Sequence, residues 1–140
     1  MTGTNIHILE MDSFKCIQES DEWSDADEVY FPFAATDGTR KETGRTKTFE
    51  SVDSGDSFDI KKIIWADPLA HGGLAVDITC WEEDDANFDK AMNIANEFVE
   101  RMFPEMSKFD LYALGAEALK QAMGEIASTA IDVAKPRFTG

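Results

Sequence analysis

Apolar and polar residues alternate through most of the first 80 positions, which is the pattern of β-strands that bury one face. The first such segment runs from Thr4 to Ile17, and its alternation slips once near Asp12, which predicts a long strand with a bulge or bend. Four further strands are predicted at residues 28–36, 45–52, 58–65 and 74–81. The first two thirds of the chain are therefore expected to be β-rich.

Turn residues separate the predicted strands. Asp37-Gly38 is a common turn pair, and residues 53–56 are typical of a tight loop in which Gly55 supplies a permissive backbone. The strand at 45–52 is rich in Thr and overlaps the basic segment at 40–47. We expect it near a sheet edge, where Lys and Arg discourage aggregation.

The hydrophobic period lengthens to three and four residues in the last third of the chain, which predicts two amphipathic helices. The first follows Asp84 or Asp85, either of which would cap it, and Pro104 is expected to end it. The second helix is expected from Asp110 onward. Residues 136–140 are predicted to form a loose tail.

The length of 140 residues and the apolar content of 43% are sufficient for one domain with a hydrophobic core. We therefore predict a single α+β domain over residues 1–140. In this domain, an antiparallel β-sandwich or curled sheet packs on a C-terminal helical pair. The β-rich part is expected over residues 1–85 and the helices over residues 86–135.

The formal charge of −15 narrows the classes of partner. A nucleic acid is not expected, because binding its phosphates requires a basic surface, and an anionic membrane is disfavoured unless calcium bridges the two. The partners that we expect are therefore cationic or apolar proteins, a second copy of the chain, or metal ions. No apolar stretch is long enough to span a bilayer and no common secretion signal is recognisable, so we expect a soluble chain of undetermined location.

The two cysteines give little information about redox chemistry. Cys16 and Cys80 would pair if their strands were neighbours, whereas two buried thiols are the favoured interpretation. The redox compartment of the protein therefore stays open.

Three acidic clusters lie beside the ends of predicted strands. In a β-sandwich, loops after alternate strands emerge at the same end, so we expect at least the first and third clusters to converge. Converging carboxylates favour calcium, which takes about six to eight oxygen ligands. Alternatively, the clusters are solvated turns. Their members are Asp21, Asp25, Asp27 and Glu28, then Asp53 and Asp56, and finally Glu82, Glu83, Asp84 and Asp85.

Two of these stretches resemble the calcium-binding loops of C-two type β-sandwich modules. In that family a Ser-Asp-Pro-Tyr signature opens the strand after the first acidic loop, and a later strand ends in an Asp-x-Asp loop. Residues 24–30 read SDADEVY, in which Glu28-Val29 replaces the Pro, and residues 76–85 read VDITCWEEDD. The resemblance implies that Asp21 and Asp27 are first-loop ligands.

The same resemblance implies that Glu82, Asp84 and Asp85 are third-loop ligands, and Asp25 completes the predicted calcium site. The similarity covers at most residues 1–85, because two helices occupy the last third of the chain. The basic lipid-binding strand of the family has an equivalent only in residues 40–47.

Protein association is the second interpretation of the sequence. The second helix contains small residues that permit close approach of another helix, either within the protein or across a dimer. Trp23 lies inside the first acidic loop, where it either inserts into a partner or covers the base of the loop. The predicted contact residues are Trp23, Ala118, Ala122 and Ala130.

Motifs of enzymes are not evident in the sequence. His7 and His71 lack the spacing of a zinc site, and an EF-hand is excluded because residues 21–27 lack its central Gly. We therefore expect a non-enzymatic calcium-binding or assembly protein. The alternatives are a metal-independent subunit that assembles through its second helix, and a small hydrolase that uses carboxylates such as Asp27 with Glu82.

Overall fold

The computed structural model describes residues 5–17, 27–83 and 85–135, with the backbone alone described at residues 27 and 85–87. The described chain forms antiparallel strands followed by two C-terminal helices, so the predicted α+β class is confirmed. The strands form three small sheets, none of which closes into a barrel among these residues. The strands are β1 (Ile6–Lys15), β2 (Asp27–Tyr30), β3 (Pro32–Thr36), β4 (Lys41–Arg45), β5 (Phe49–Val52), β6 (Ser57–Pro68), β7 (Ala75–Ile78) and β8 (Trp81–Glu82). The helices are α1 (Asp85–Ser107) and α2 (Ala116–Ala134).

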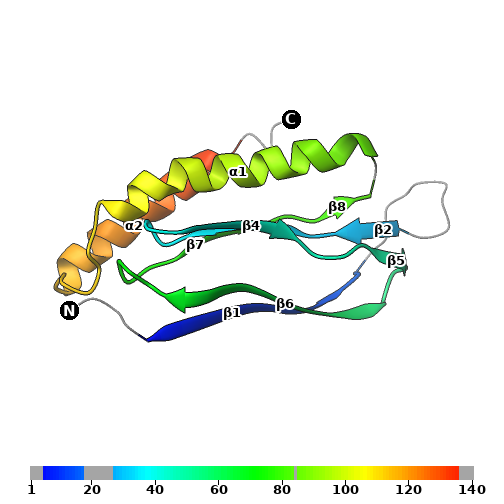
Figure 1. Cartoon of the computed structure of the whole chain (residues 1–140), viewed down its shortest axis with the longest axis horizontal. Helices are drawn as coiled ribbons and strands as arrows, with labels where there is room; N and C mark the ends of the chain where they lie inside the picture. Colours follow the sequence, from blue (N-terminus) through cyan, green and yellow to red (C-terminus); the bar gives the residue numbers. More distant parts are fainter. Residues whose placement is uncertain (1–4, 18–26, 84, 136–140) are drawn as a thin grey trace.

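The elements are stacked in three layers, with the helices on one side, six short strands in the middle and the β1–β6 ribbon on the other side (Figure 1). In the middle layer, β3 pairs with β4 and β7, and β2 pairs with β5 and β8. The two three-stranded sheets lie end to end, because β2 leads into β3, β4 leads into β5, and β7 leads into β8. Thr46 N–H donates to Phe31 O at 3.1 Å, and Thr79 N–H donates to Pro32 O at 3.1 Å, so pairing continues between the sheets.

The central strand β3 is buried on both faces, because it separates two hydrophobic cores. On the helix side, Ala34 contributes to a core of α1, α2 and β7 residues, and its small side chain permits close approach of α1. On the ribbon side, Phe33 and Ala35 pack with Met11, Ile64 and Trp65. The helix-side core contains Ala34, Ala75, Ala95, Phe98, Val99, Met102, Met106 and Val133.

The β1–β6 ribbon has the irregular register that the sequence predicts. Register shifts occur between Leu9 and Glu10 and between Met11 and Ser13, so the expected bulge near Asp12 is confirmed. Near the far end of the ribbon, Phe14 packs on three rings, those of Phe31, Phe49 and Phe58, with centroids 4.8 to 5.2 Å away. This aromatic cluster joins the ribbon to β5 and to the break between β2 and β3.

Both helices differ from their predicted bounds. Pro104 lies inside α1, which continues to Ser107, so the prediction that Pro104 ends the helix is wrong. The second helix begins at Ala116 rather than Asp110. Leu111, whose spacing matched the helical stripe, instead packs in the connection, where its N–H donates to His71 O at 2.8 Å.

Three predicted strands are each shorter or divided in the structure. The segment 28–36 breaks at Phe31, the segment 45–52 becomes the end of β4 and β5, and the segment 74–81 becomes β7 and β8. The expected edge position is confirmed, because β4 and β5 are edge strands of their sheets. The prediction of buried thiols is wrong for Cys80, which is exposed, and Cys16 is only half-buried.

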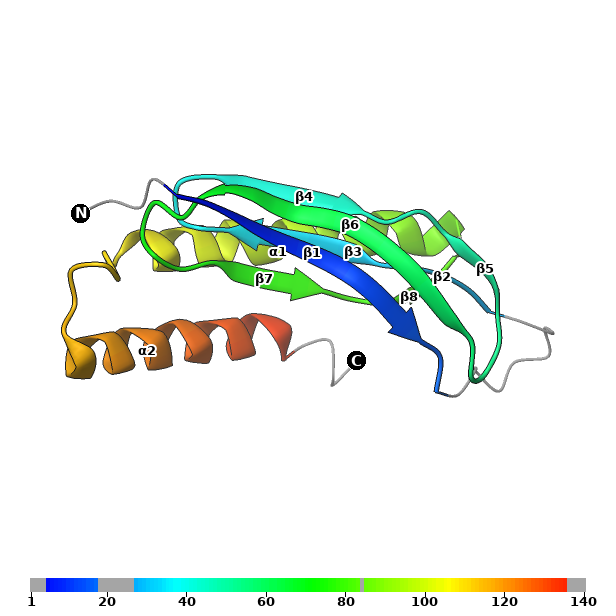
Figure 2. The same cartoon turned by 90° about the horizontal axis from the view of Figure 1, so that it is seen from below.

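The two helices differ in how they cover the sheet. α1 lies over the middle layer, whereas α2 lies beside α1 and beyond the edge formed by β7 (Figure 2). Neither helix of the described residues has both the length and the apolar character that a membrane span requires.

Candidate functional site

The described parts of all three acidic clusters meet at one end of the molecule, which we call the acidic end. Antiparallel pairing places Val29 opposite Glu82, and Glu83 N–H donates to Glu28 O at 2.7 Å, so the start of β2 adjoins the end of β8. On the other side of β2, Asp27 pairs with Val52, the last residue of β5. The acidic end therefore comprises residues 27–28, 52–56 and 82–83.

The turn at residues 53–56 is held in place by the end of β1. Asp56 N–H donates to Asp53 O at 3.0 Å, and Asp53 N–H donates to a carboxylate oxygen of Asp56 at 3.0 Å. Gly55 adopts φ +91°, as the predicted permissive position requires, and its N–H donates to Cys16 O at 2.6 Å. Both flanks of residues 18–26, Ile17 and Asp27, consequently lie at the acidic end.

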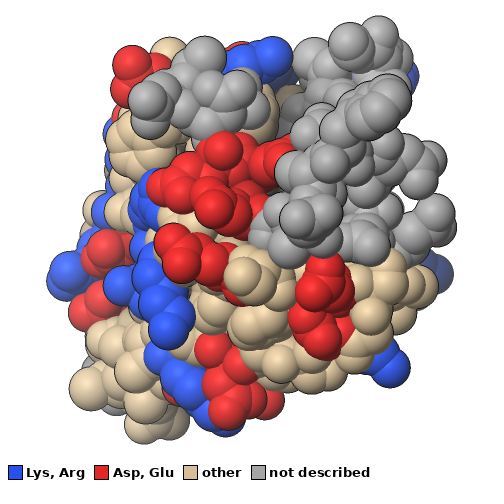
Figure 3. Space-filling model, turned by 90° about the vertical axis from the view of Figure 1, so that its right-hand side faces the viewer, with Lys and Arg blue, Asp and Glu red and all other residues tan. Residues whose placement is uncertain are grey.

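Carboxylates are concentrated on the surface of this end. Figure 3, which looks directly onto it, shows Asp and Glu side chains across the centre of the face and Lys and Arg mainly along one side. Glu28, Asp53 and Glu83 are exposed, and Asp56 and Glu82 are half-buried. Like charges this close raise the free energy of the folded state unless water, a base or a cation offsets the repulsion.

Arg45 brings positive charge to the acidic end. Its guanidinium lies 4.1 Å from the ring centre of Tyr30 and 5.5 Å from that of Phe88. Nη2 donates to Thr48 Oγ1 at 2.7 Å, and that hydroxyl donates to Glu83 Oε1 at 3.2 Å. Arg45 is therefore linked to a carboxylate of the third cluster through one hydroxyl group.

The predicted calcium ligands are only partly described. Asp21, Asp25 and Asp84, like the predicted contact residue Trp23, lie outside the described residues. Glu82 belongs to β8, opposite Val29 of β2. Asp27 begins β2 and Asp85 begins α1, so the backbone of these two predicted ligands, like Glu82, lies at a strand or helix end at the acidic end.

Two observations bear on the alternative interpretation, in which the acidic clusters are solvated turns that bind no metal. The N-terminus of α1 lies at the acidic end (Figure 1), and the positive end of a helix dipole favours negative charge nearby. Among the side chains that the structure describes, which exclude those of residues 27 and 85–87, no three of His, Cys, Asp or Glu are grouped closely enough to hold a metal ion. Any calcium site of the predicted composition therefore depends on side chains beyond those described.

The predicted contact residues of α2 are not on one surface. Ala122 is 3% exposed and Ala130 packs against the helix-side core, whereas Ala118 is exposed. Of the two alternatives for the small residues, packing within the chain accounts for Ala122 and Ala130.

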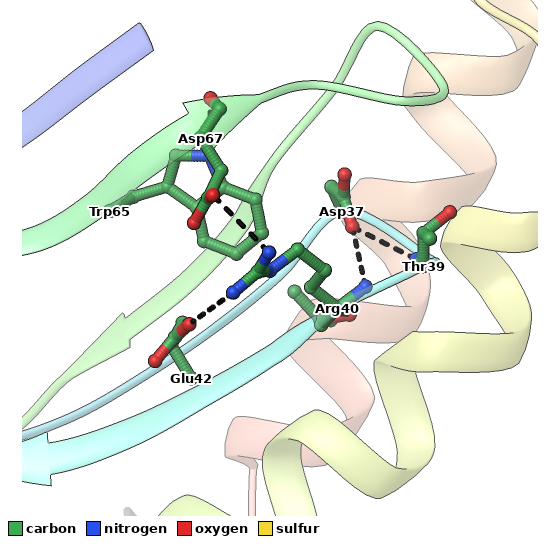
Figure 4. Close-up of polar contacts among 7 residues, drawn as sticks. Asp37, Thr39, Arg40, Glu42, Trp65 and Asp67 are labelled. Atoms are coloured by element: carbon green, nitrogen blue, oxygen red, sulfur yellow. Dashed lines mark hydrogen bonds and ion pairs between the residues drawn. The ribbon is translucent and has the colours of Figure 1, made fainter. Parts of the chain in front are cut away.

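A second polar cluster lies at the opposite end, which we call the Asp37 end. Asp37 is 1% exposed, and one carboxylate oxygen accepts N–H groups of Thr39 and Arg40 at 2.9 and 2.8 Å (Figure 4). The other oxygen accepts the Ala70 N–H at 3.0 Å. Arg40 also lies 3.3 Å from Asp67 and 3.7 Å from Glu42.

The Asp37 end is closed by contacts with the end of α1. Gly38 has φ +92°, and a Cβ there would lie 2.7 Å from the backbone carbon of Met106. Ser107 Oγ donates to Gly38 O at 2.7 Å. Tyr112 OH donates to Leu69 O at 2.6 Å. The carboxylate of Asp37 is therefore used to fix two loops, and we interpret this cluster as structural.

Only part of the information needed to predict the positions of Asp37 and Arg45 was present in the sequence. Asp37-Gly38 indicated a turn but gave no sign that the carboxylate is buried, because its partner Ala70 is 33 residues away. Arg45 appeared only as one residue of a basic segment. Comparison with known proteins adds no assignment, since no protein family, curated protein or solved structure matches the chain.

Proposed function

We propose that the protein is a non-enzymatic calcium-binding protein whose site lies at the acidic end. The observation that carries this proposal is the strand register: β2 pairs with both β5 and β8, which gathers three acidic segments of the chain at one end. The ion would order these loops or bridge them to a partner. The resemblance of residues 24–30 and 76–85 to C-two loops supports the same location.

The chemistry of the donors favours calcium over softer metals. Carboxylate and carbonyl oxygens are the ligands of hard dications, and calcium accepts more of them, in a more flexible geometry, than magnesium does. The proposed ligands are Asp21, Asp25, Asp27, Glu82, Asp84 and Asp85. A dication would also offset the repulsion among carboxylates in a chain of charge −15.

Thermal unfolding in EDTA, in calcium and in magnesium tests the proposal. Calcium at a hundred times its dissociation constant adds about 2.7 kcal/mol to the free energy of unfolding. For a domain of this size that corresponds to a rise in Tm of about 10 °C. Magnesium at the same concentration is expected to give a smaller rise.

A charge-matched pair of variants locates the site. The double variant Asp27→Asn, Glu82→Gln should lose the calcium-dependent rise in Tm and the heat of calcium binding in isothermal titration calorimetry. The control Glu97→Gln, Asp132→Asn removes the same charge from exposed helix positions and should retain both. Equal calcium affinity in the two double variants would contradict the proposed location.

A further inference from the structure

The apolar surface of α2 is wider than the face that the chain itself covers. Ala122 and Val133 are buried, and Ile126 and Ala130 pack against the helix-side core. Met123 and Ile131, by contrast, are 53% and 63% exposed. Apolar side chains of this size exposed on one helix are typical of a contact surface.

These exposed residues form a continuous stripe. Met123, Ala127 and Ile131 follow one another at intervals of four, so they lie on one side of the helix. Next to them, a Cβ on Gly124 would meet nothing within 4 Å. We call this stripe of Met123, Ala127 and Ile131 the outer face of α2. The helix that carries this stripe lies beyond β7, at the edge of the sheet (Figure 2).

The outer face is complementary to itself. If two α2 helices pack antiparallel with Ala127 at the centre, Met123 of each copy lies opposite Ile131 of the other, because the two residues are equally distant from Ala127. The small side chain of Ala127 permits close approach at the crossing point. Such an isologous contact closes on itself and gives a dimer.

The charges beside the outer face match the same arrangement. Glu117 and Lys135 are eighteen residues apart, which is five turns of about 3.6 residues, so both lie on one flank of the helix. Glu117 is ten residues and Lys135 eight residues from Ala127, so in the antiparallel pair each Glu117 lies within about 3 Å, measured along the helix axis, of Lys135 of the other copy. Residues 116–135 carry three acidic and two basic side chains, so only −1 of the chain's −15 resides there.

We propose that the protein forms a dimer in which the outer faces of two α2 helices pack antiparallel about Ala127. This inference is independent of the proposed calcium site, whose residues lie at the acidic end and not on α2. One helix face buries less than the standard interface of about 1,600 Å², so the dimer is weak and depends on concentration. Added salt strengthens it, because salt screens the repulsion between two acidic chains.

Sedimentation equilibrium over a range of protein concentrations gives the first test. The native chain should move from the mass of one chain toward that of two as concentration rises. Met123→Glu and Ile131→Glu should each shift the dissociation constant upward at least tenfold, whereas Ala118→Glu, an exposed change of equal charge on the side of α2 opposite Ala127, should not. Circular dichroism melts would verify that the variants remain folded.

A charge exchange tests the antiparallel register. Glu117→Lys and Lys135→Glu should each weaken the dimer severalfold, and the double variant should restore it, because the exchanged charges again face each other. A mass of one chain at all concentrations, or a dimer that resists both Met123→Glu and Ile131→Glu, would overturn the proposal.

Cross-linking gives a direct readout of the orientation, in a chain that also carries Cys16→Ser and Cys80→Ser. A mixture of the Met123→Cys and Ile131→Cys variants should form disulfide-linked pairs on oxidation faster than either variant alone. If Met123→Cys alone links fastest, the helices are parallel and the proposed arrangement is wrong.

Discussion

The two ends of the sheet use carboxylates in opposite ways. At the Asp37 end, a single buried carboxylate accepts three backbone N–H groups and thereby joins the β3–β4 turn to the β6–β7 connection. At the acidic end, exposed carboxylates from three segments lie near one another, and Arg45 reaches one of them, Glu83, only through Thr48. Backbone N–H groups occupy both oxygens of Asp37, whereas the carboxylates of Asp56 and Glu83 at the acidic end accept hydrogen bonds from Asp53 N–H and the Thr48 hydroxyl and lie nearer the surface.

This difference distinguishes a carboxylate that holds two loops together from carboxylates that we propose bind a cation. A buried carboxylate whose partners are all backbone amides rigidifies its surroundings and has no capacity left for a ligand. Clustered surface carboxylates instead oppose the folded state and are relieved when a cation binds. Substitutions should therefore reduce stability at the Asp37 end and change cation affinity at the acidic end.

The largest effect is expected for Asp37→Ala. The change leaves three backbone N–H groups without their acceptor in a buried site, which should lower the free energy of unfolding by about 3 to 5 kcal/mol. Glu83→Ala at the acidic end removes an exposed carboxylate and should change it by less than about 0.5 kcal/mol. Urea unfolding measures both, and equal losses would remove the distinction between the two ends.

A pair of glycines isolates the effect of packing. Gly38 and Gly55 have nearly the same φ, +92° and +91°, but only at Gly38 would a Cβ meet backbone atoms. Gly55→Ala should lower the free energy of unfolding by about 1 to 2 kcal/mol, from backbone strain alone. Gly38→Ala should lower it by about 2 to 4 kcal/mol, because overpacking adds to the strain. If chemical denaturation gives equal values, the close contact with α1 is not maintained in solution.

Arg45→Met is expected to have a moderate effect on stability and the opposite effect on calcium binding. Loss of the contacts with the rings of Tyr30 and Phe88 should lower the free energy of unfolding by about 1 kcal/mol. Removal of the cation should raise the calcium affinity severalfold in calorimetric titration. Arg45→Lys is the control, since it keeps the charge, and it should leave the affinity nearly unchanged.

The smallest effect concerns Lys108, which follows α1 at the Asp37 end. A hydrogen bond from its ammonium to Glu105, with the negative charge of that carboxylate, raises the Lys108 pKa above its usual value of 10.5. The interaction therefore stabilises the fold fully below pH 10.5, and the contribution disappears as pH rises through the raised pKa. Lys108→Met should flatten this alkaline loss in denaturant titrations, and an unchanged pH profile would contradict it.

The spacing of apolar residues predicted those features of the fold that depend only on residues close together in the sequence. The slip near Asp12 identified the bulge of β1, and the three-and-four spacing identified both helices. The break at Phe31 was missed because Val29, Phe31 and Phe33 continue to alternate through it. Pro32 was the available signal, since it has no N–H to donate to a neighbouring strand.

Contacts between distant residues could not be read from the sequence. The buried position of Asp37 depends on Ala70, and the division of the α2 surface into covered and outer faces depends on how α1 packs. For the candidate site, the sequence contains three acidic clusters, and we expected at least two of them to converge. Only the strand register shows that β2 adjoins both β5 and β8 at that end.

Hydrogen–deuterium exchange with and without calcium tests the central claim most directly, because it compares the two ends in one sample. Calcium should slow exchange of backbone amides in residues 27–30, 49–56 and 81–83, and leave the amides of Thr39, Arg40 and Ala70 unchanged. EDTA should reverse the effect. Unchanged exchange at the acidic end, or equal protection at both ends, would contradict a calcium site formed by the acidic end.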